Sequence, residues 1–271
     1  MSIDELNKIS KEIGKKLIYM HAKSKESHIG SSLSIVDILT VLYFSILNID
    51  PKDPYNPDRD RLILSKGHAS SALYAILSKR GFFSEKILDT FAENNSKISV
   101  HPERFSGPGI EISSGSLGHG LSIGVGISLM AKKKKKKFKT YIIMSDGECE
   151  EGSNWEAVIS ASRFKLDNLI AIIDKNGLQA YEKTDNILNL KSLKNKWEAF
   201  GGSAIEIDGH NYFELMKTLN LIPFEKDKPS VIIAETIKGK GIKEMENKLE
   251  RHYKSPKLED IEEYLRSLEG E

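Results

Sequence analysis

Two short apolar runs in the sequence are each followed by a polar residue that could bind a metal ion. Asp146 follows the run at residues 140–144, and Asn176 follows the run at residues 168–174. If the runs are neighbouring parallel strands, about 4.8 Å apart, their carboxyl ends bring these side chains within reach of a common ion. Carboxylate and amide oxygens suit Mg²⁺ or Ca²⁺ and not zinc, and Mg²⁺ needs few protein ligands when phosphate oxygens complete its octahedron. Gly147 would let the backbone approach such a phosphate closely.

Each of these signals is weak when it stands alone, because Asp-Gly and Asn-Gly are ordinary turn sequences. Their order along the chain is more specific. Asp-Gly at 146–147 is followed by Glu-Gly at 151–152, by a capped helix, and by a second predicted strand that ends in Asn-Gly at 176–177. The combination therefore favours a metal and phosphate site over a pair of unrelated turns.

The elements that must position these residues can be predicted from five short runs. The runs are continuously apolar, and the intervals between them are long enough for crossover helices, which is typical of buried parallel strands. We therefore expect an α/β fold of three α/β/α layers with a mostly parallel central sheet, formed by residues 1–271 as a single domain. The predicted strands are residues 61–65, 140–144, 168–174, 204–208 and 230–235.

Helices are predicted where a capping residue precedes helical apolar periodicity. The first, residues 3–23, follows a capping box that opens at Ser2. The second is predicted at residues 34–46, with the hydroxyl of Ser34 as its cap. Ser153 is predicted to open the capping box of a helix that begins near residue 154, next to the proposed metal site.

The composition argues against several classes of function. The 271 residues carry 40 basic and 39 acidic side chains, so the strong positive field of a nucleic-acid surface or a polybasic membrane anchor is missing. A single cysteine, Cys149, cannot form an intramolecular disulfide or a zinc site of several thiolates, and we interpret it as a bystander. Neither an uninterrupted apolar run of membrane-spanning length nor a signal-like N-terminal segment occurs. We expect a soluble cytoplasmic protein with no nucleic-acid or membrane partner.

The pattern around Asp146 and Asn176 resembles the thiamine diphosphate fingerprint, which opens with Gly-Asp-Gly and closes with a doublet ending in Asn roughly thirty residues later. Here Ser145 replaces the first glycine. More specifically, the chain resembles the N-terminal, diphosphate-binding half of transketolase over nearly its full length. The matching segments are the fingerprint, SHIGSSLS at 27–34, LSKGHASSALYA at 64–75, HPE at 101–103, SSGSLGHGLSIGVG at 113–126 and TIKGKG at 236–241.

This resemblance implies thiamine diphosphate as the cofactor and Mg²⁺ as the metal, with Ca²⁺ or Mn²⁺ as substitutes. The implied metal ligands are the side chains of Asp146 and Asn176 and the backbone carbonyl of Leu178. The implied cofactor contacts are His68, Gly147 and Glu148, together with Gly115, Ser116 and Leu117 at the aminopyrimidine ring. The implied catalytic residues are His28, His68, His101 and His252 around the substrate, and Glu151, which would link paired active sites at a subunit interface.

Other residues that could suggest chemistry are interpreted as structural. His21, on the first helix, and His210, in a turn expected to cap a helix, are assigned no catalytic role, and the role of His119 stays open. The glycines between 118 and 126 superficially suggest a nucleotide loop, but no acidic residue follows a βα unit at the confirming spacing. Close helix packing at a subunit interface is the preferred interpretation.

In the family that the chain resembles, an activating glutamate and most residues that grip the sugar phosphate lie in a second domain, which would follow residue 271. The last residues read as a closing helix and a natural end. The resemblance thus implies the N-terminal subunit of a split transketolase, which transfers a two-carbon ketol unit from a ketose phosphate to an aldose phosphate. It would be inactive without a separate C-terminal subunit that carries the pyrimidine-binding domain, in a heterotetramer.

Two other interpretations remain open. One is a subunit of another thiamine diphosphate enzyme, such as the α subunit of a 2-oxoacid dehydrogenase or a deoxyxylulose-phosphate synthase fragment. The other is a non-catalytic scaffold subunit that retains the fold. The histidines at 28, 68 and 101 favour ketol transfer, and the intact Asp146, Gly147 and Asn176 argue against a scaffold.

Overall fold

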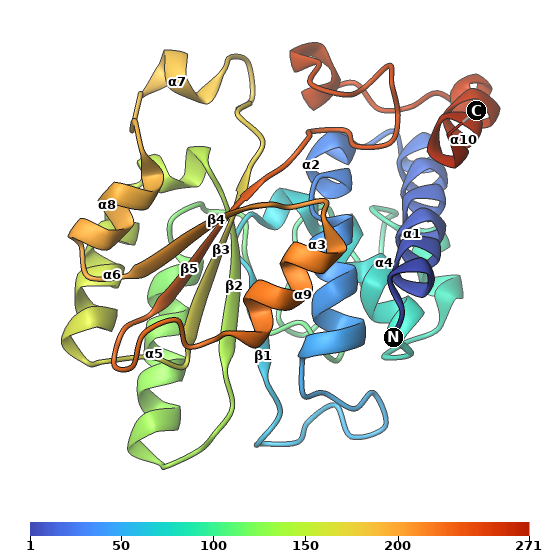
Figure 1. Ribbon diagram of the computed structural model, residues 1–271. Helices are drawn as coiled ribbons and strands as arrows, with labels where there is room; N and C mark the ends of the chain where they lie inside the picture. Colours follow the sequence, from blue (N-terminus) through green and yellow to red (C-terminus); the bar gives the residue numbers. More distant parts are fainter. Residues whose placement is uncertain (271) are drawn as a thin grey trace.

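The computed structural model describes residues 1–270 and contains a central five-stranded sheet (Figure 1). All neighbouring strands pair in parallel, in the order β1-β2-β3-β5-β4. The prediction of five parallel strands is confirmed, with ends that differ by no more than one residue. The strands are β1 (Arg61–Leu64), β2 (Thr140–Ser145), β3 (Leu169–Lys175), β4 (Ser203–Asp208) and β5 (Ser230–Glu235).

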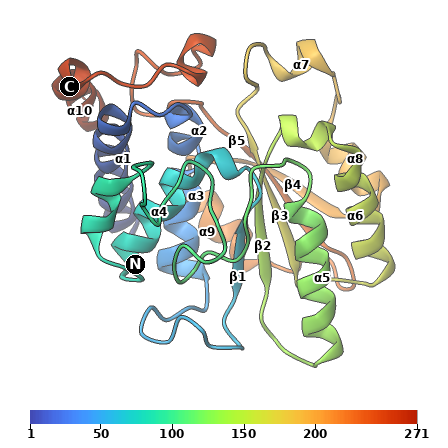
Figure 2. The same ribbon diagram turned by 180° about the vertical axis from the view of Figure 1, so that it is seen from behind.

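Helices cover both faces of the sheet and give the predicted three layers, which Figures 1 and 2 show from opposite sides. One outer layer contains α5 (Gly120–Lys133), α6 (Gly152–Arg163) and α8 (Leu193–Ala199). The other contains α1 (Ile3–Ser24), α2 (Ile29–Leu33), α3 (Val36–Val41), α4 (Ser70–Arg80) and α9 (Tyr212–Asn220). Two further helices are α7 (Thr184–Ile187), above the sheet in Figure 1, and α10 (Ile261–Glu269), which packs on α1. Short 3₁₀ helices span Gly67–Ala69, Glu85–Thr90, Gly147–Glu150, Leu249–His252 and Leu258–Asp260, and a π-helical turn spans Leu42–Ile46.

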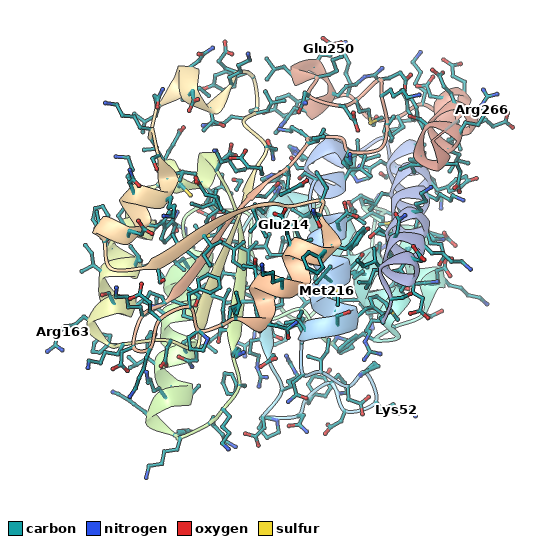
Figure 3. All side chains as sticks on the ribbon, in the orientation of Figure 1. Lys52, Arg163, Glu214, Met216, Glu250 and Arg266 are labelled. Carbon is teal, nitrogen blue, oxygen red and sulfur yellow. The ribbon has the colours of Figure 1, made fainter. Side chains whose placement is uncertain are left out.

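The buried residues form two apolar clusters, one on each face of the sheet. Alternate residues of β3 show the division, because Ile170 and Ile172 belong to one cluster whereas Ala171 and Ile173 belong to the other. Successive side chains of a strand point to opposite faces, so a strand with helices on both sides must be apolar throughout. Side chains fill the space between the layers, while Arg163 extends outward at the periphery (Figure 3). No helix in the described part of the chain has the length and apolar character needed to cross a bilayer.

The register of β2 and β3 places the two predicted metal ligands at one edge of the sheet. Ser145 pairs with Asp174 across these strands. The backbone N–H of Asp146 donates to the carbonyl oxygen of Asp174 at 3.1 Å. Asp146 and Asn176 therefore follow the carboxyl ends of neighbouring parallel strands, as the sequence predicts.

The helix starts were predicted with mixed success. The first helix is confirmed, and Ser2 forms the expected capping box. The second prediction is wrong, because residues 34–46 are divided between α3 and the π-helical turn and Ser34 caps neither. Its hydroxyl instead donates to the buried carboxylate of Asp174 at 2.7 Å. Ser153 is also no cap: α6 already begins at Gly152, and the Ser153 hydroxyl donates to the carbonyl oxygen of Gly118 at 2.7 Å.

Gly124 of the glycine-rich segment packs closely within the chain, and packing of this segment at a subunit interface stays a prediction. Gly124 on α5 faces the sheet, where a Cβ atom would lie 2.8 Å from Ile142 Cδ1 and 3.3 Å from Leu169 Cδ1. Gly126 on the same helix has open space, with nothing within 4 Å of a Cβ atom. The two glycines thus form a matched pair for testing how closely α5 contacts the sheet.

We expect Gly124→Ala to lower the free energy of unfolding by about 1–3 kcal/mol, because the added methyl group overpacks the contact with the sheet. Gly126→Ala should raise it by up to about 1 kcal/mol, because alanine is the better helix former. Urea denaturation of both variants measures the difference. Equal effects of the two substitutions would contradict the close approach of α5 to Ile142.

Candidate functional site

A cavity of about 320 Å³ opens at the carboxyl edge of the sheet, where Asp146 and Asn176 lie. Segments distant in the sequence meet there, because parallel strands end at the same edge and the loops that follow them converge. Eleven of the thirteen residues to which the sequence assigns a role line this cavity. They are His28, His68, His101, Gly115, Leu117, Asp146, Gly147, Glu151, Asn176, Leu178 and His252.

The carboxylate of Asp146 is almost completely buried and held by three donors. Oδ1 accepts from the N–H of Gly147 at 2.9 Å, and Oδ2 accepts from the N–H of Gly177 at 2.8 Å and the hydroxyl of Thr184 at 3.1 Å. Burial, followed by the nearby carboxylate of Asp174, raises the pKa of Asp146 to about 6. A cation beside this carboxylate would favour its charged form.

The other two predicted ligands complete a set of oxygen atoms. The Asn176 amide nitrogen donates to Asp174 Oδ2 at 3.0 Å, while its amide oxygen accepts from the N–H of Leu178 at 3.2 Å. The described residues contain no group of three or more His, Cys, Asp or Glu side chains suited to a metal ion. One carboxylate, one amide oxygen and the Leu178 carbonyl instead form the sparse set that fits Mg²⁺ when phosphate oxygens supply the other ligands. The residues present therefore fit a metal-bound diphosphate.

A fully buried ion pair lies beneath the cavity, and the sequence analysis missed both of its members. The Lys66 ammonium donates to Asp174 Oδ2, and both side chains have 0% exposure. Asp174 also accepts from Ser34, Thr236 and Asn176. Burial tends to raise the pKa of Asp174, but Lys66 and these hydrogen bonds outweigh it, so the pKa is lowered and the carboxylate stays charged. Asp174 thereby fixes the orientation of the Asn176 amide.

A second buried lysine, Lys238, lines the cavity and was also missed. Its ammonium donates to the carbonyl oxygen of Leu178 at 3.1 Å and to Nδ1 of His252 at 2.7 Å. Burial and the charge of Lys66 lower the pKa of Lys238 to about 8. Both lysines lie within motifs that carry the family resemblance, yet lysine is usually a surface residue and nothing local in the sequence indicates burial. Because Asp174 balances the charge of Lys66, Lys238 is the lysine that gives this part of the cavity a positive charge suited to an anionic ligand.

Three of the predicted histidines form a cluster in the cavity. The ring centroids lie 5.3 Å apart for His28 and His68, and 4.8 Å apart for His28 and His252. Burial, with nearby positive charges, lowers the pKa of His28 to about 4 and that of His252 to about 3, and it lowers the pKa of His68 well below 6.5. All three are therefore neutral at pH 7, and each offers one donor and one acceptor nitrogen.

One nitrogen in this cluster points to an additional ligand. His28 Nδ1 is buried and has no hydrogen-bond partner among the described residues. Such buried polar atoms are rare in native proteins and require a partner. His101 approaches the same cavity from another loop, where its ring lies against the backbone of Gly115: a Cβ atom there would lie 3.0 Å from His101 Cδ2. The histidines that the sequence singled out are thus brought together.

Two predicted cofactor contacts, Ser116 and Glu148, do not line the cavity. The Glu148 side chain is fully buried, and its carboxylate accepts from the N–H of Gly118 at 2.9 Å, the N–H of Ser145 at 3.3 Å and the hydroxyl of Ser65. It therefore ties the Asp-Gly loop to the glycine-rich loop and the end of β1. Buried donors surround both oxygens of this carboxylate, which supports the loops at the cavity, and its direct contact with the cofactor stays a prediction.

The residues interpreted as structural lie outside the cavity. His21 is buried, and its ring nitrogens contact the Ser71 hydroxyl at 2.8 Å and the Glu26 carbonyl oxygen at 2.9 Å. The turn that contains His210 caps α9 as expected, through the side chain of Asn211. Burial raises the pKa of Cys149 well above its usual value, so this residue is an unreactive thiol. His119, at the start of α5, is exposed and contacts the Leu117 carbonyl oxygen at 3.0 Å.

The chain is similar over most of its length to known proteins. Residues 14–269 match the family described as "Transketolase, thiamine diphosphate binding domain". A protein of Actinobacillus succinogenes that is named as one subunit of an apulose-4-phosphate transketolase is 44% identical, over 100% of this chain and 98% of that protein. "6-deoxy-6-sulfo-D-fructose transketolase subunit SqwG" of Clostridium sp. is 42% identical, over 83% and 82%. The crystal structure of transketolase from Campylobacter jejuni superimposes with a TM-score of 0.92 at 32% identity, and the alignment covers 100% of this chain but only 43% of that longer one.

Proposed function

The chain belongs to the transketolase family, and we propose on this premise that it is the N-terminal subunit of a transketolase built from two different chains. With a separate C-terminal subunit it would transfer a two-carbon ketol unit from a ketose phosphate to an aldose phosphate. Similarity over the whole length of a protein that is itself named as one subunit of a transketolase supports the two-chain arrangement. The observation that carries the proposal is the single cavity in which the oxygen atoms of Asp146 and Asn176 meet buried lysine and histidine side chains.

We propose that Asp146, Asn176 and the Leu178 carbonyl hold Mg²⁺ and that the diphosphate of thiamine diphosphate completes its coordination, with Ca²⁺ or Mn²⁺ as possible replacements. When bound, the cofactor supplies the carbanion chemistry that cleaves a carbon–carbon bond next to a carbonyl group. Lys238 would balance the diphosphate charge, since its buried ammonium already contacts the Leu178 carbonyl. The loop that contains Gly115 and Leu117 would lie beneath the aminopyrimidine ring.

The neutral histidines can form hydrogen bonds with the hydroxyl groups of a sugar. A neutral imidazole can accept a proton at one nitrogen and donate one at the other, whereas a charged one can only donate. The unpartnered Nδ1 of His28 is free for such a contact. Nδ1 of His252 accepts a hydrogen bond from the Lys238 ammonium. The proton of the neutral ring therefore lies on Nε2, where it can be donated to substrate. We also assign contacts with sugar hydroxyl groups to His68 and His101, which line the same cavity.

We further propose that two copies of each chain form a heterotetramer. The helices α5 and α6 carry exposed apolar side chains, among them Ile123 at 39%, Met130 at 51% and Ile159 at 51% exposure. Exposed apolar residues on adjacent helices are typical of an assembly surface. Glu151 lies at the start of α6 beside the cavity, which is consistent with a contact between paired sites. The cytoplasm is the proposed location, because the single cysteine is a buried free thiol.

We propose that the C-terminal subunit determines which sugar phosphate is bound. The two relatives described above are named for different sugars, apulose 4-phosphate and 6-deoxy-6-sulfo-D-fructose. The cavity of this chain provides cofactor-binding groups and histidines; of its two lysines, Lys66 is paired with Asp174 and Lys238 is assigned to the diphosphate. Residues that bind the sugar phosphate would therefore come from the C-terminal subunit, as the family resemblance implies.

Reconstitution tests this function. The chain is mixed with the product of a neighbouring reading frame that encodes a pyrimidine-binding domain, and ketol transfer to ribose 5-phosphate is measured with xylulose 5-phosphate or apulose 4-phosphate as donor. We expect transfer only when both chains, thiamine diphosphate and Mg²⁺ are present, because each supplies part of the site. Release of carbon dioxide from a 2-oxoacid without ketol transfer would favour a 2-oxoacid dehydrogenase. Equal activity of the partner with and without this chain would favour a scaffold.

A further inference from the structure

His210 lies outside the cavity but contacts the segment that carries Lys238. The backbone N–H of Ile237 donates to Nε2 of His210 at 2.9 Å, and Ile237 directly precedes Lys238 in the chain. The Lys238 ammonium in turn contacts the Leu178 carbonyl and His252 inside the cavity. His210, which precedes α9, therefore anchors the backbone segment that carries the buried Lys238 ammonium into the cavity.

The contacts of His210 specify which of its nitrogens carries the proton. Nε2 accepts from a backbone N–H and so must be unprotonated, which places the proton on Nδ1. Nδ1 lies 2.8 Å from Asp37 Oδ2, and the other oxygen of Asp37 accepts from the hydroxyl of Tyr212 at 2.5 Å. Asp37 lies on α3 and Tyr212 on α9. Two helices thus hold the imidazole in the one tautomer that can accept from Ile237.

The neighbouring anchors show why this hydrogen bond matters for Lys238. On the N-terminal side of Ile237, the Thr236 hydroxyl donates to Asp174. On the C-terminal side of Lys238, the N–H of Gly239 donates to the carbonyl oxygen of Gly30 at 3.0 Å. The contact between Ile237 and His210 is the anchor directly before the lysine. Without an acceptor at that point, the N–H of the peptide between Thr236 and Ile237, one residue before Lys238, would lose its partner, and this peptide could rotate.

We propose that His210 is a positioning residue that, through Ile237, holds the Lys238 ammonium where the diphosphate of the cofactor binds. The inference rests on the proposed function, because that function provides the diphosphate. His210 does not itself touch cofactor or substrate. Its effect should therefore appear in the affinity for the diphosphate group and not in the affinity for the sugar.

Two substitutions at this position separate the roles of its two nitrogens. In His210→Gln the amide oxygen can occupy the place of Nε2 and accept from Ile237, whereas the shorter side chain of His210→Asn reaches only the place of Nδ1, near Asp37. In the reconstituted complex we expect His210→Asn to raise the half-saturating concentration of thiamine diphosphate about tenfold, as loss of a partner for a partly buried N–H would. His210→Gln should stay within about threefold of the wild type. The KM for the ketose phosphate at saturating cofactor should change in neither.

Hydrogen exchange of the Ile237 amide in the full chain gives a second measurement that does not depend on activity. We expect faster exchange in His210→Asn and near-normal exchange in His210→Gln. The proposal is overturned if the two variants are equal in both measurements, or if the KM for the sugar rises together with the cofactor requirement. A wild-type complex without ketol transfer would contradict the proposed function, and the difference in exchange between the variants would still report on the positioning of Ile237.

Discussion

Replacing Asp146 with alanine is expected to weaken the binding of thiamine diphosphate with Mg²⁺ more than about a hundredfold, since loss of an outer partner of a metal ligand already costs up to that factor. Ketol transfer should fall to background. Asp146 is the only carboxylate in the proposed set of ligands, and it lies in a cavity where its charge is poorly solvated. Titration calorimetry of the reconstituted complex with cofactor and Mg²⁺ measures this loss directly.

The matched control is Asp4→Ala, which removes an exposed carboxylate on α1, far from the cavity. This variant should bind as the wild type does. Because Asp146 also accepts from Gly177 and Thr184, Asp146→Asn is included: it retains acceptor capacity but lacks the charge. Thermal unfolding without cofactor identifies any general loss of structure. Equal cofactor affinity of the wild type and Asp146→Ala would contradict the assignment of Asp146 as a metal ligand.

Replacing Asp174 with alanine should lower the free energy of unfolding by about 3–5 kcal/mol, because it leaves the charge of Lys66 buried without a counterion. Both side chains have 0% exposure, so water cannot take the place of the carboxylate without rearrangement of the protein. Ser34 and Asn176 would lose an acceptor at the same time. Chemical denaturation measures the change, and cofactor affinity should also decrease because the Asn176 amide loses its anchor.

A double substitution isolates the electrostatic part of this effect. Asp174→Asn alone removes the negative charge but keeps an oxygen acceptor, and Lys66→Met removes the positive charge while retaining an unbranched side chain. The double variant Lys66→Met/Asp174→Asn should be more stable than Asp174→Asn alone, since a pair of charges removed together leaves no uncompensated ion. If Asp174→Asn is no less stable than the double variant, Lys66 does not depend on Asp174 for its charge.

The fold could be predicted well because its signals are local and repeated. A strand covered on both faces is apolar where helices pack on it, and β3 (Leu169–Lys175) is apolar over its first five residues. Parallel strands also end at one edge, so Asp146 and Asn176 are expected to lie close together if their strands are neighbours, and the pairing of β2 with β3 meets that condition. The histidines could be selected because each lies in a loop motif that resembles the family, although their spacing along the chain does not indicate that they meet.

The failed predictions share one cause, which is competition from a partner distant in the sequence. Ser34 precedes an apolar helical pattern and is a good helix cap by local criteria, but its hydroxyl is used by Asp174, 140 residues away. Ser153 donates to Gly118, which lies 35 residues earlier in the chain. A serine can satisfy only a few hydrogen bonds, and a buried carboxylate or carbonyl that needs a donor outweighs a solvent-exposed cap.

The sequence by itself determined the layered α/β architecture, the family and the proposed pair of oxygen ligands that follow β2 and β3, because each depends on the types and order of neighbouring residues. Only the tertiary structure decided which charges are buried and what each buried group contacts. Lys66, Lys238 and His210 look like ordinary surface or turn residues in the sequence. Their roles arise from Asp174, Leu178 and Ile237, which folding brings to them from 108, 60 and 27 residues away. The cost of burying a charge or polar group depends on such partners, and no local pattern reveals them.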